Sequence, residues 1–246
     1  MADVAIIGGT GLTRLEGLQT SGSESVETPF GPPSSALSHG ILAGRDVVFL
    51  ARHGAGHTLP PHKINYRANL WALKQTGVRA VIAVAAVGGI RQDMAPARLA
   101  VPDQIIDYTH SRSATFFEDD LTHVTHIDFT YPYDPALRQA LVRACREARV
   151  DAVEDGTYGA TQGPRLESAA EIARLERDGC TMVGMTGMPE AALARELELP
   201  YGACAVVANW AAGKTEGTIS MASIEAYVRQ GMDSVRLVLE RLIPAI

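Results

Sequence analysis

The polar side chains best suited to chemistry stand directly after short apolar runs of the sequence. Arg52 and His53 follow the run that ends at Leu50, and Thr186 follows the run that ends at Gly184. An arginine guanidinium matches phosphate geometry by bidentate donation, and hydroxyl groups supply further donors. These residues predict an anion site. Each also has an ordinary alternative: a surface ion pair for Arg52, a core histidine for His53 and a helix N-cap for Thr186.

A glycine-rich turn follows the first apolar run, in the stretch VAIIGGTGL. Gly8, Gly9 and Gly11 permit positive φ angles and close approach of a ligand to the backbone. Thr10 adds a hydroxyl donor. A dinucleotide fingerprint would need a third glycine or alanine where Arg14 stands, and a helix directly afterwards, but the Ser- and Pro-rich residues that follow do not resemble a helix. The turn is open to three interpretations: a structural turn, an anion loop or a dinucleotide loop.

A second group of residues has the chemistry needed to hold a heterocyclic base. Glu167 comes shortly after the rigid pair Gly163-Pro164, and Asn209 follows the apolar run Ala203–Ala208. A carboxylate accepts a hydrogen bond from a ring N–H, whereas an amide both donates and accepts. Glu167 could equally be a charge near a helix N-terminus, and Asn209 a turn residue after a strand. The residues alone leave both interpretations open.

Composition excludes several classes of function. The chain has 246 residues, of which 46% are hydrophobic and 20% charged, and its formal net charge of −6 without any basic block excludes a nucleic-acid groove. Cys145, Cys180 and Cys204 form no C-x-x-C pair, which favours a reducing compartment over a disulfide framework or a structural zinc. No signal-peptide pattern is present, and the longest apolar run, Ala80–Ile90, is too short to span a bilayer. We expect a cytoplasmic protein with neither nucleic-acid nor membrane partners.

Short apolar runs alternate with amphipathic stretches along the whole chain. The expected strands cover residues 4–7, 47–50, 81–87, 104–108, 182–184 and 203–208, and the expected helices cover residues 65–76, 135–149, 168–177, 189–197 and, beginning at 220 or 223, the stretch to 242. This alternation predicts an α/β fold with a central mixed sheet flanked by helices, in which residues 1–246 form a single domain. Ligands in such folds bind beyond the carboxyl ends of the strands.

Several motifs in order along the chain resemble the purine nucleoside phosphorylase/methylthioadenosine phosphorylase family. They are AIIGGTGL, LARHGAGHTLPPHKINYRANLWALK, GPRLES, GMTGMPEAALARE and AVVANWAAG, and the resemblance extends from near Val4 to about Ile224. It implies a nucleoside phosphorylase-like fold, a homotrimer with sites at subunit interfaces, and reversible phosphorolysis of a purine nucleoside. Inorganic phosphate would be the co-substrate, and no metal or organic cofactor is expected.

The resemblance also implies roles for individual residues of this chain. Phosphate would be held by Thr10, Arg52, His53, the backbone amide of Ala86, and Thr186. Met185 would line the ribose, and Glu167 and Asn209 would hold the base and act in catalysis. Leu166 stands where a base-packing aromatic is frequent, and Ala211 stands two residues after Asn209. His126 would reach across the trimer interface toward the sugar 5′ end, where Met221 and Ile224 would pack the 5′ substituent.

Two positions indicate which nucleoside is cleaved. Family members that act on adenine nucleosides carry Asp-x-Asp where this chain has Asn209, Trp210 and Ala211. Asn209 can donate to O6 and accept from N7–H, and Glu167 can accept from N1–H, so misplaced donors should disfavour adenine by about 1–3 kcal/mol per group. Apolar Met221 stands where ordinary 6-oxopurine enzymes carry a histidine for the 5′-hydroxyl.

The expected substrate is therefore 5′-methylthioinosine, cleaved to hypoxanthine and 5-methylthioribose 1-phosphate. The alternatives are a 5′-methylthioadenosine or inosine/guanosine phosphorylase and, from another class, a catalytically weak purine-binding protein.

Overall fold

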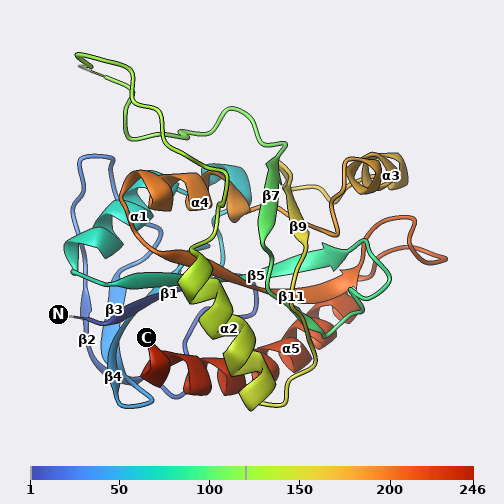
Figure 1. The fold of residues 1–246 in the computed structure, drawn as a ribbon, viewed down its shortest axis with the longest axis horizontal. Coiled ribbons are helices and arrows are strands. Elements are labelled where there is room, and N and C mark those ends of the chain that lie inside the picture. The colour runs from blue at the N-terminus through green and yellow to red at the C-terminus, as the bar shows by residue number, and fades with distance from the viewer. Residues whose placement is uncertain (1, 120) are drawn as a thin grey trace.

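The computed structural model describes residues 2–119 and 121–246, and it shows a mixed sheet with helices on both faces (Figure 1). The sheet order is β2-β3-β4-β1-β5-β10-β9-β7, with β11 paired to β5 and to β6, and β6 paired to β8. The strands are β1 (Val4–Gly8), β2 (Gln19–Glu24), β3 (Leu37–Leu42), β4 (Arg45–Ala51), β5 (Ala80–Gly89), β6 (Leu99–Ala100), β7 (Gln104–Asp107), β8 (Ala152–Val153), β9 (Thr157–Ala160), β10 (Met182–Gly184) and β11 (Tyr201–Trp210). The predicted α/β fold with a central mixed sheet is confirmed.

The register of the central strands brings their carboxyl ends together. Strand β1 pairs in parallel with β4, where Gly8 lies opposite Ala51, and in parallel with β5. Strand β5 also pairs in parallel with β11 and, near its end, antiparallel with β10, where Gly88 lies opposite Val183. Because β10 runs back along β5, the residues after Gly184 lie beside the middle of β5. The turns after β1, β4 and β10 therefore meet at one place on the sheet.

Side chains alternate between the two faces of β1 and so build two separate cores. Ala5 and Ile7 belong to the cluster that includes residues of α1 (Tyr66–Gln75) and α4 (Gly187–Glu196). Val4 and Ile6 belong to the cluster that includes residues of α2 (Pro135–Glu147) and α5 (Met221–Leu242). All four β1 side chains are fully buried, as expected for a strand covered by helices on both faces.

The helices lie close to where their sequence signals predict. Helix α3 (Ala169–Arg177) begins after Ser168, which forms a capping box with Glu171, and both hydrogen bonds of that box are present. Helix α4 is assigned from Gly187, but the extended backbone of Met188 interrupts it, so its regular turns begin at the expected Pro189. Two 3-10 turns, Pro61–Lys63 and Ile243–Ala245, complete the helical elements of the described residues. None of the described helices combines the length and apolar character needed to cross a membrane.

A long arm without helix or strand projects from the body between β7 and α2 (Figure 1). It comprises residues 109–119 and 121–131. The apolar side chains of Leu121, Val124 and Tyr131 on this arm are exposed. Arg112 fixes the base of the arm to the body, because its guanidinium donates to the carbonyl oxygens of Met185 (2.8 Å), Met188 (2.7 Å) and Gln162 (2.8 Å).

Candidate active site

One cavity of about 290 Å³ gathers nearly all of the residues singled out in the sequence. Its lining includes Thr10, Arg52, His53, Ala86, Leu166, Glu167, Met185, Thr186, Asn209, Ala211, Met221 and Ile224. These residues come from loops, from strands and from the start of α5, and they are spread over more than 200 positions. Their convergence is therefore a property of the fold and not of local sequence. His126 is exposed on the arm and does not line this cavity.

The glycine turn packs tightly against two other strands. A side chain at Gly9 would place its Cβ 2.6 Å from the Val84 carbonyl oxygen and 2.8 Å from Nη1 of Arg52. Gly11 has a φ of +84°, in the left-handed region that favours glycine. No helix follows the turn, since the chain continues into β2, and the dinucleotide interpretation therefore lacks its structural context. What remains is a tight turn whose neighbour is a guanidinium.

Substitution of Gly9 by alanine tests whether this close approach matters. We expect Gly9→Ala to raise the KM for phosphate roughly tenfold, because the added methyl group must displace Arg52 or the β5 backbone at a cost of about 1–3 kcal/mol. Steady-state kinetics with varied phosphate measure the effect. Gly22→Ala is the matched control, because a Cβ at Gly22 meets nothing within 4 Å. An unchanged KM for Gly9→Ala would contradict the role of the turn.

Arg52 is fully buried and held in a fixed orientation. Its Nε and Nη2 atoms donate to the two carboxylate oxygens of Glu190 at 2.7 and 2.8 Å, and its Nη1 donates to the Val84 carbonyl oxygen at 2.8 Å. Tyr201 donates a further hydrogen bond to Glu190 at 2.8 Å. Burial opposes the charged form of Arg52, but the charge and hydrogen bonds of Glu190 outweigh burial, so the pKa of the guanidinium is raised. The alternative for Arg52 was a surface ion pair. Arg52 does form an ion pair, but the pair is buried and lies at the cavity.

His53 is a neutral hydrogen-bonding group in this cavity. Its Nδ1 atom lies 2.8 Å from the Leu59 carbonyl oxygen, so Nδ1 carries the proton and Nε2 is left as an acceptor. Burial, the Arg52 charge and nearby His57 lower the pKa of His53 to about 4. At neutral pH the imidazole can therefore accept a hydrogen bond from a protonated phosphate oxygen, and it adds no positive charge.

The lowered pKa of His53 predicts how stability changes with pH. Between about pH 6.5 and 4 the unfolded chain binds a proton that the folded chain excludes, so the contribution of His53 to the free energy of unfolding is lost as pH falls through this window. Between pH 7 and pH 4, the free energy of unfolding of the wild type should fall by on the order of 2 kcal/mol more than that of His53→Gln. Urea unfolding of both proteins measures the difference, and parallel pH profiles would contradict the assignment.

Thr186 and Ala86 line the same cavity as Arg52. Thr186 is buried at the start of α4, where its side chain makes no capping hydrogen bond and its backbone N–H donates to the Tyr158 hydroxyl at 3.3 Å. Thr186 thus stands at the N-cap position, as one alternative supposed, but its side chain does not cap the helix. Ala86 lies in β5, directly opposite Val206 of β11.

Glu167 and Asn209 line the same cavity from two other segments. Glu167 precedes the N-cap of α3 and accepts a hydrogen bond from the Thr161 hydroxyl at 2.6 Å, while Glu171 supplies the acidic charge of the first helical turn. Glu167 therefore lies close to the helix N-terminus, as one alternative supposed, and its carboxylate is also held by Thr161 at the cavity. The Asn209 amide donates from Nδ2 to the Trp210 carbonyl oxygen at 2.7 Å, which leaves one N–H and the amide oxygen available.

A bulge explains why Asn209 faces the cavity. Asn209 lies within β11, not after it, and the pairing with β5 shifts register between Val207 and Asn209. A bulge of this kind redirects a side chain and is common beside active sites. The interpretation of Asn209 as a turn residue after a strand is wrong for this reason.

Three residues that carry the site were not found from the sequence. Glu190 and Tyr201 orient Arg52, and His57 lines the cavity with its ring centroid 4.7 Å from that of His53. Each resembles an ordinary helix, strand or loop residue when read alone. The only available signal for His57 was its place in the same motif as Arg52 and His53.

Within residues 2–119 and 121–246, no cluster of His, Cys, Asp and Glu could hold a metal ion.

Comparison with known proteins places this chain in a family. Residues 3–244 match the model of the phosphorylase superfamily. A probable S-methyl-5′-thioinosine phosphorylase from Pseudomonas syringae is 57% identical over 245 residues, which cover 100% of both chains. A 6-oxopurine nucleoside phosphorylase from Pyrococcus furiosus is 43% identical over 97% of this chain and 91% of its own. A methylthioadenosine phosphorylase from Schistosoma mansoni in complex with adenine superimposes with a TM-score of 0.95 at 30% identity, covering 100% of this chain and 92% of that one.

Proposed function

Because this chain belongs to the phosphorylase superfamily, we propose that it catalyses phosphorolysis of a 6-oxopurine 5′-methylthionucleoside. The products are hypoxanthine and 5-methylthioribose 1-phosphate, a reaction of purine salvage. One observation carries the proposal: a single cavity contains both the glycine turn with Arg52 and the pair Glu167 and Asn209. The relatives named for S-methyl-5′-thioinosine and 6-oxopurine nucleosides support the same substrate class.

We assign phosphate to the part of the cavity around Arg52. Thr10, His53, the Ala86 amide and Thr186 line the same cavity as the guanidinium and offer donors and one acceptor. Among the cavity-lining residues that the structure describes, Arg52 is the only lysine or arginine, and its charge is already balanced by Glu190. A bound phosphate dianion therefore keeps much of its negative charge, which favours a cationic sugar beside it.

The proposed reaction depends on groups at both sides of the sugar: the phosphate dianion at one side, and the leaving purine held by Asn209 and Glu167 at the other. The bond from the anomeric carbon to N9 stretches first, its electrons go to the purine, and a phosphate oxygen forms the new bond to the carbon. Asn209 donates to O6 and accepts from N7–H as the leaving base gains a proton, and Glu167 accepts from N1–H. Met185 packs against the ribose, and Leu166 and Ala211 pack beside the base.

The apolar residues Met221 and Ile224 support a methylthio group at the sugar 5′ end. A 5′-hydroxyl placed against these two side chains would gain no hydrogen bond from them, whereas a methylthio group would pack against both. An inosine-specific enzyme is the alternative within the same chemistry.

Rates on four nucleosides, with and without phosphate, test the proposal. We expect phosphate-dependent release of base from 5′-methylthioinosine at a kcat/KM at least tenfold above those for 5′-methylthioadenosine, inosine and adenosine, given about 1–3 kcal/mol per mismatched group. Binding of purines without any phosphate-dependent release would instead indicate a binding protein. A preference for 5′-methylthioadenosine would show that Asn209 does not select the base as argued.

The arm supports assembly into a homotrimer, with His126 acting in the site of a neighbouring copy. The arm projects from the body, exposes Leu121 and Val124, and carries an exposed His126 that is absent from the cavity of its own chain (Figure 1). Sedimentation equilibrium measures the assembly state. We place the reaction in the cytoplasm, in keeping with the free and buried thiols of Cys145, Cys180 and Cys204, and treat residues 1–246 as one domain.

A further inference from the structure

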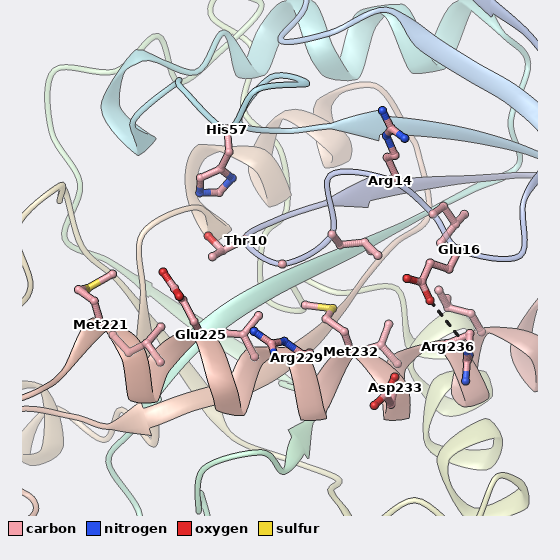
Figure 2. Close-up of a pocket in the computed structure, with 17 residues that line it drawn as sticks. Thr10, Arg14, Glu16, His57, Met221, Glu225, Arg229, Met232, Asp233 and Arg236 are labelled. Atoms are coloured by element: carbon pink, nitrogen blue, oxygen red, sulfur yellow. Dashed lines mark ion pairs between the residues drawn. The ribbon is translucent and has the colours of Figure 1, made fainter.

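A groove of about 430 Å³ runs along α5 and continues the substrate cavity beyond the sugar 5′ end (Figure 2). We call it the 5′ groove; its walls are residues 10–12 and 14–16 of the glycine-turn loop and one face of α5 from Met221 to Leu239. Thr10, His57, Met221 and Ile224 line both the groove and the substrate cavity. A 5′ substituent longer than methylthio would therefore pass directly into the groove.

The floor of the 5′ groove is apolar, whereas its rim is charged. Leu12, Ile224 and Val228 are buried beneath it. Glu225 and Arg229 stand on successive turns of α5, and Glu225 points toward the side where Thr10 and His57 lie (Figure 2). Next to the substrate cavity, apolar contact for a thioether chain is thus followed by Glu225 and Arg229, and Arg14 and Asp233 add charges elsewhere in the groove lining.

The two charges nearest the substrate are free to meet a ligand. Within the described part of the chain, neither Glu225 nor Arg229 takes part in an ion pair, although both are exposed on the same helix. The far end of the groove is different, because Arg236 pairs there with Glu16 at 3.6 Å (Figure 2). An arginine fork binds a carboxylate bidentately, and a carboxylate binds an ammonium group.

The spacing of Met221, Glu225 and Arg229 along α5 fits a short ligand tail that ends in an ammonium and a carboxylate group. Each step of four residues along a helix advances about 6 Å, so Glu225 lies about 6 Å beyond Met221 and Arg229 about 6 Å further. A homocysteine tail carries its ammonium and carboxylate on the carbon three bonds beyond the sulfur. We propose that the 5′ groove binds nucleosides whose 5′ sulfur carries a terminal α-amino acid, with its ammonium at Glu225 and its carboxylate at Arg229.

This inference rests on the proposed function, because the tailed nucleoside would undergo the same phosphorolysis. Phosphate replaces the base at the anomeric carbon, and the tail is unchanged. The substrate class therefore includes 6-oxopurine nucleosides with a zwitterionic 5′-thioether, in addition to the methylthio compound. Thr10, His57, Met221 and Ile224 form the passage between the two parts of the site.

Three nucleosides and four proteins test the inference. The nucleosides are 5′-methylthioinosine, 5′-butylthioinosine and 5′-deoxyinosine joined through sulfur to homocysteine, and the proteins are wild type, Glu225→Gln, Arg229→Gln and, outside the groove, Arg241→Gln. We expect the wild-type kcat/KM for the homocysteine compound to be about tenfold above that for the butylthio compound, as charged hydrogen bonds predict. Glu225→Gln and Arg229→Gln should each remove that advantage and change methylthioinosine turnover less than twofold, and Arg241→Gln should change neither.

Two results would overturn the inference while leaving the proposed function intact. One is cleavage of methylthioinosine with no advantage for the homocysteine compound, as expected if a second copy covers the groove. The other is an equal effect of Arg229→Gln on all three nucleosides. If no nucleoside is cleaved, the proposed function fails, and calorimetric binding of the homocysteine compound then decides the inference: equal affinity for wild type and Arg229→Gln contradicts it.

Discussion

Replacing Glu190 by alanine is expected to lower the free energy of unfolding by about 3–5 kcal/mol, because it removes one partner of a buried ion pair. Both charged side chains are almost completely excluded from water, at 1% exposure for Arg52 and 0% for Glu190. Without Glu190, the guanidinium of Arg52 keeps only its hydrogen bond to the Val84 carbonyl oxygen, and the Tyr201 hydroxyl loses its acceptor. Urea unfolding at pH 7 measures the loss.

The same substitution should weaken phosphate binding, because Glu190 holds the guanidinium in the orientation that faces the cavity. Glu176→Ala is the matched control: it removes a carboxylate that pairs with Lys214 at 2.7 Å on the surface, and it should cost no more than about 1 kcal/mol. Glu190→Gln separates charge from shape, since it keeps an acceptor for Tyr201. A Glu190→Ala protein as stable as the control, with an unchanged KM for phosphate, would contradict the role given to this ion pair.

Replacing Asn209 by alanine is expected to lower kcat by roughly 10²–10³, the effect of removing a donor from a group that gains charge in the transition state. The loss should fall mainly on kcat, because the hydrogen bonds of Asn209 strengthen as negative charge moves onto the leaving purine. Pre-steady-state release of hypoxanthine separates this chemical step from product release. Activity near the wild-type value would contradict the assignment.

Asn209→Asp distinguishes hydrogen bonding from packing at the same position. The aspartate keeps the shape of the side chain but replaces the donor that faces O6 with an acceptor. We expect the ratio of kcat/KM values for 5′-methylthioinosine and 5′-methylthioadenosine to shift toward the adenine nucleoside. An equal loss on both nucleosides would indicate that Asn209 only fills space.

Local signals were sufficient to predict most helices. The capping box of Ser168 and Glu171 marks the start of α3, and Asp134 with Pro135 marks the start of α2, where the Asp134 carboxylate caps the Leu137 N–H at 2.8 Å. These interactions lie within one helical turn and leave a pattern in the sequence. By contrast, β2 is polar and exposed throughout, because it lies at the sheet edge, and nothing in its composition distinguishes it from a loop.

Interactions between distant residues could not be predicted in the same way. Arg52 and Glu190 are separated by 138 positions, and the bulge that turns Asn209 toward the cavity depends on its pairing with β5. The base of the arm is held by Arg112, which donates to backbone carbonyl oxygens. Every residue has such an oxygen, so the residue types of the acceptors give no signal in the sequence. Most of the residues selected from the sequence line one cavity, but the contacts that orient them could not be predicted.

A crystal structure with inorganic phosphate tests the central claim most directly. The anion should lie in the turn formed by Gly9 and Thr10, within hydrogen-bond distance of the Arg52 guanidinium and the Thr186 hydroxyl. Clear density for phosphate at another place, with this turn holding only water at saturating phosphate, would contradict the claim.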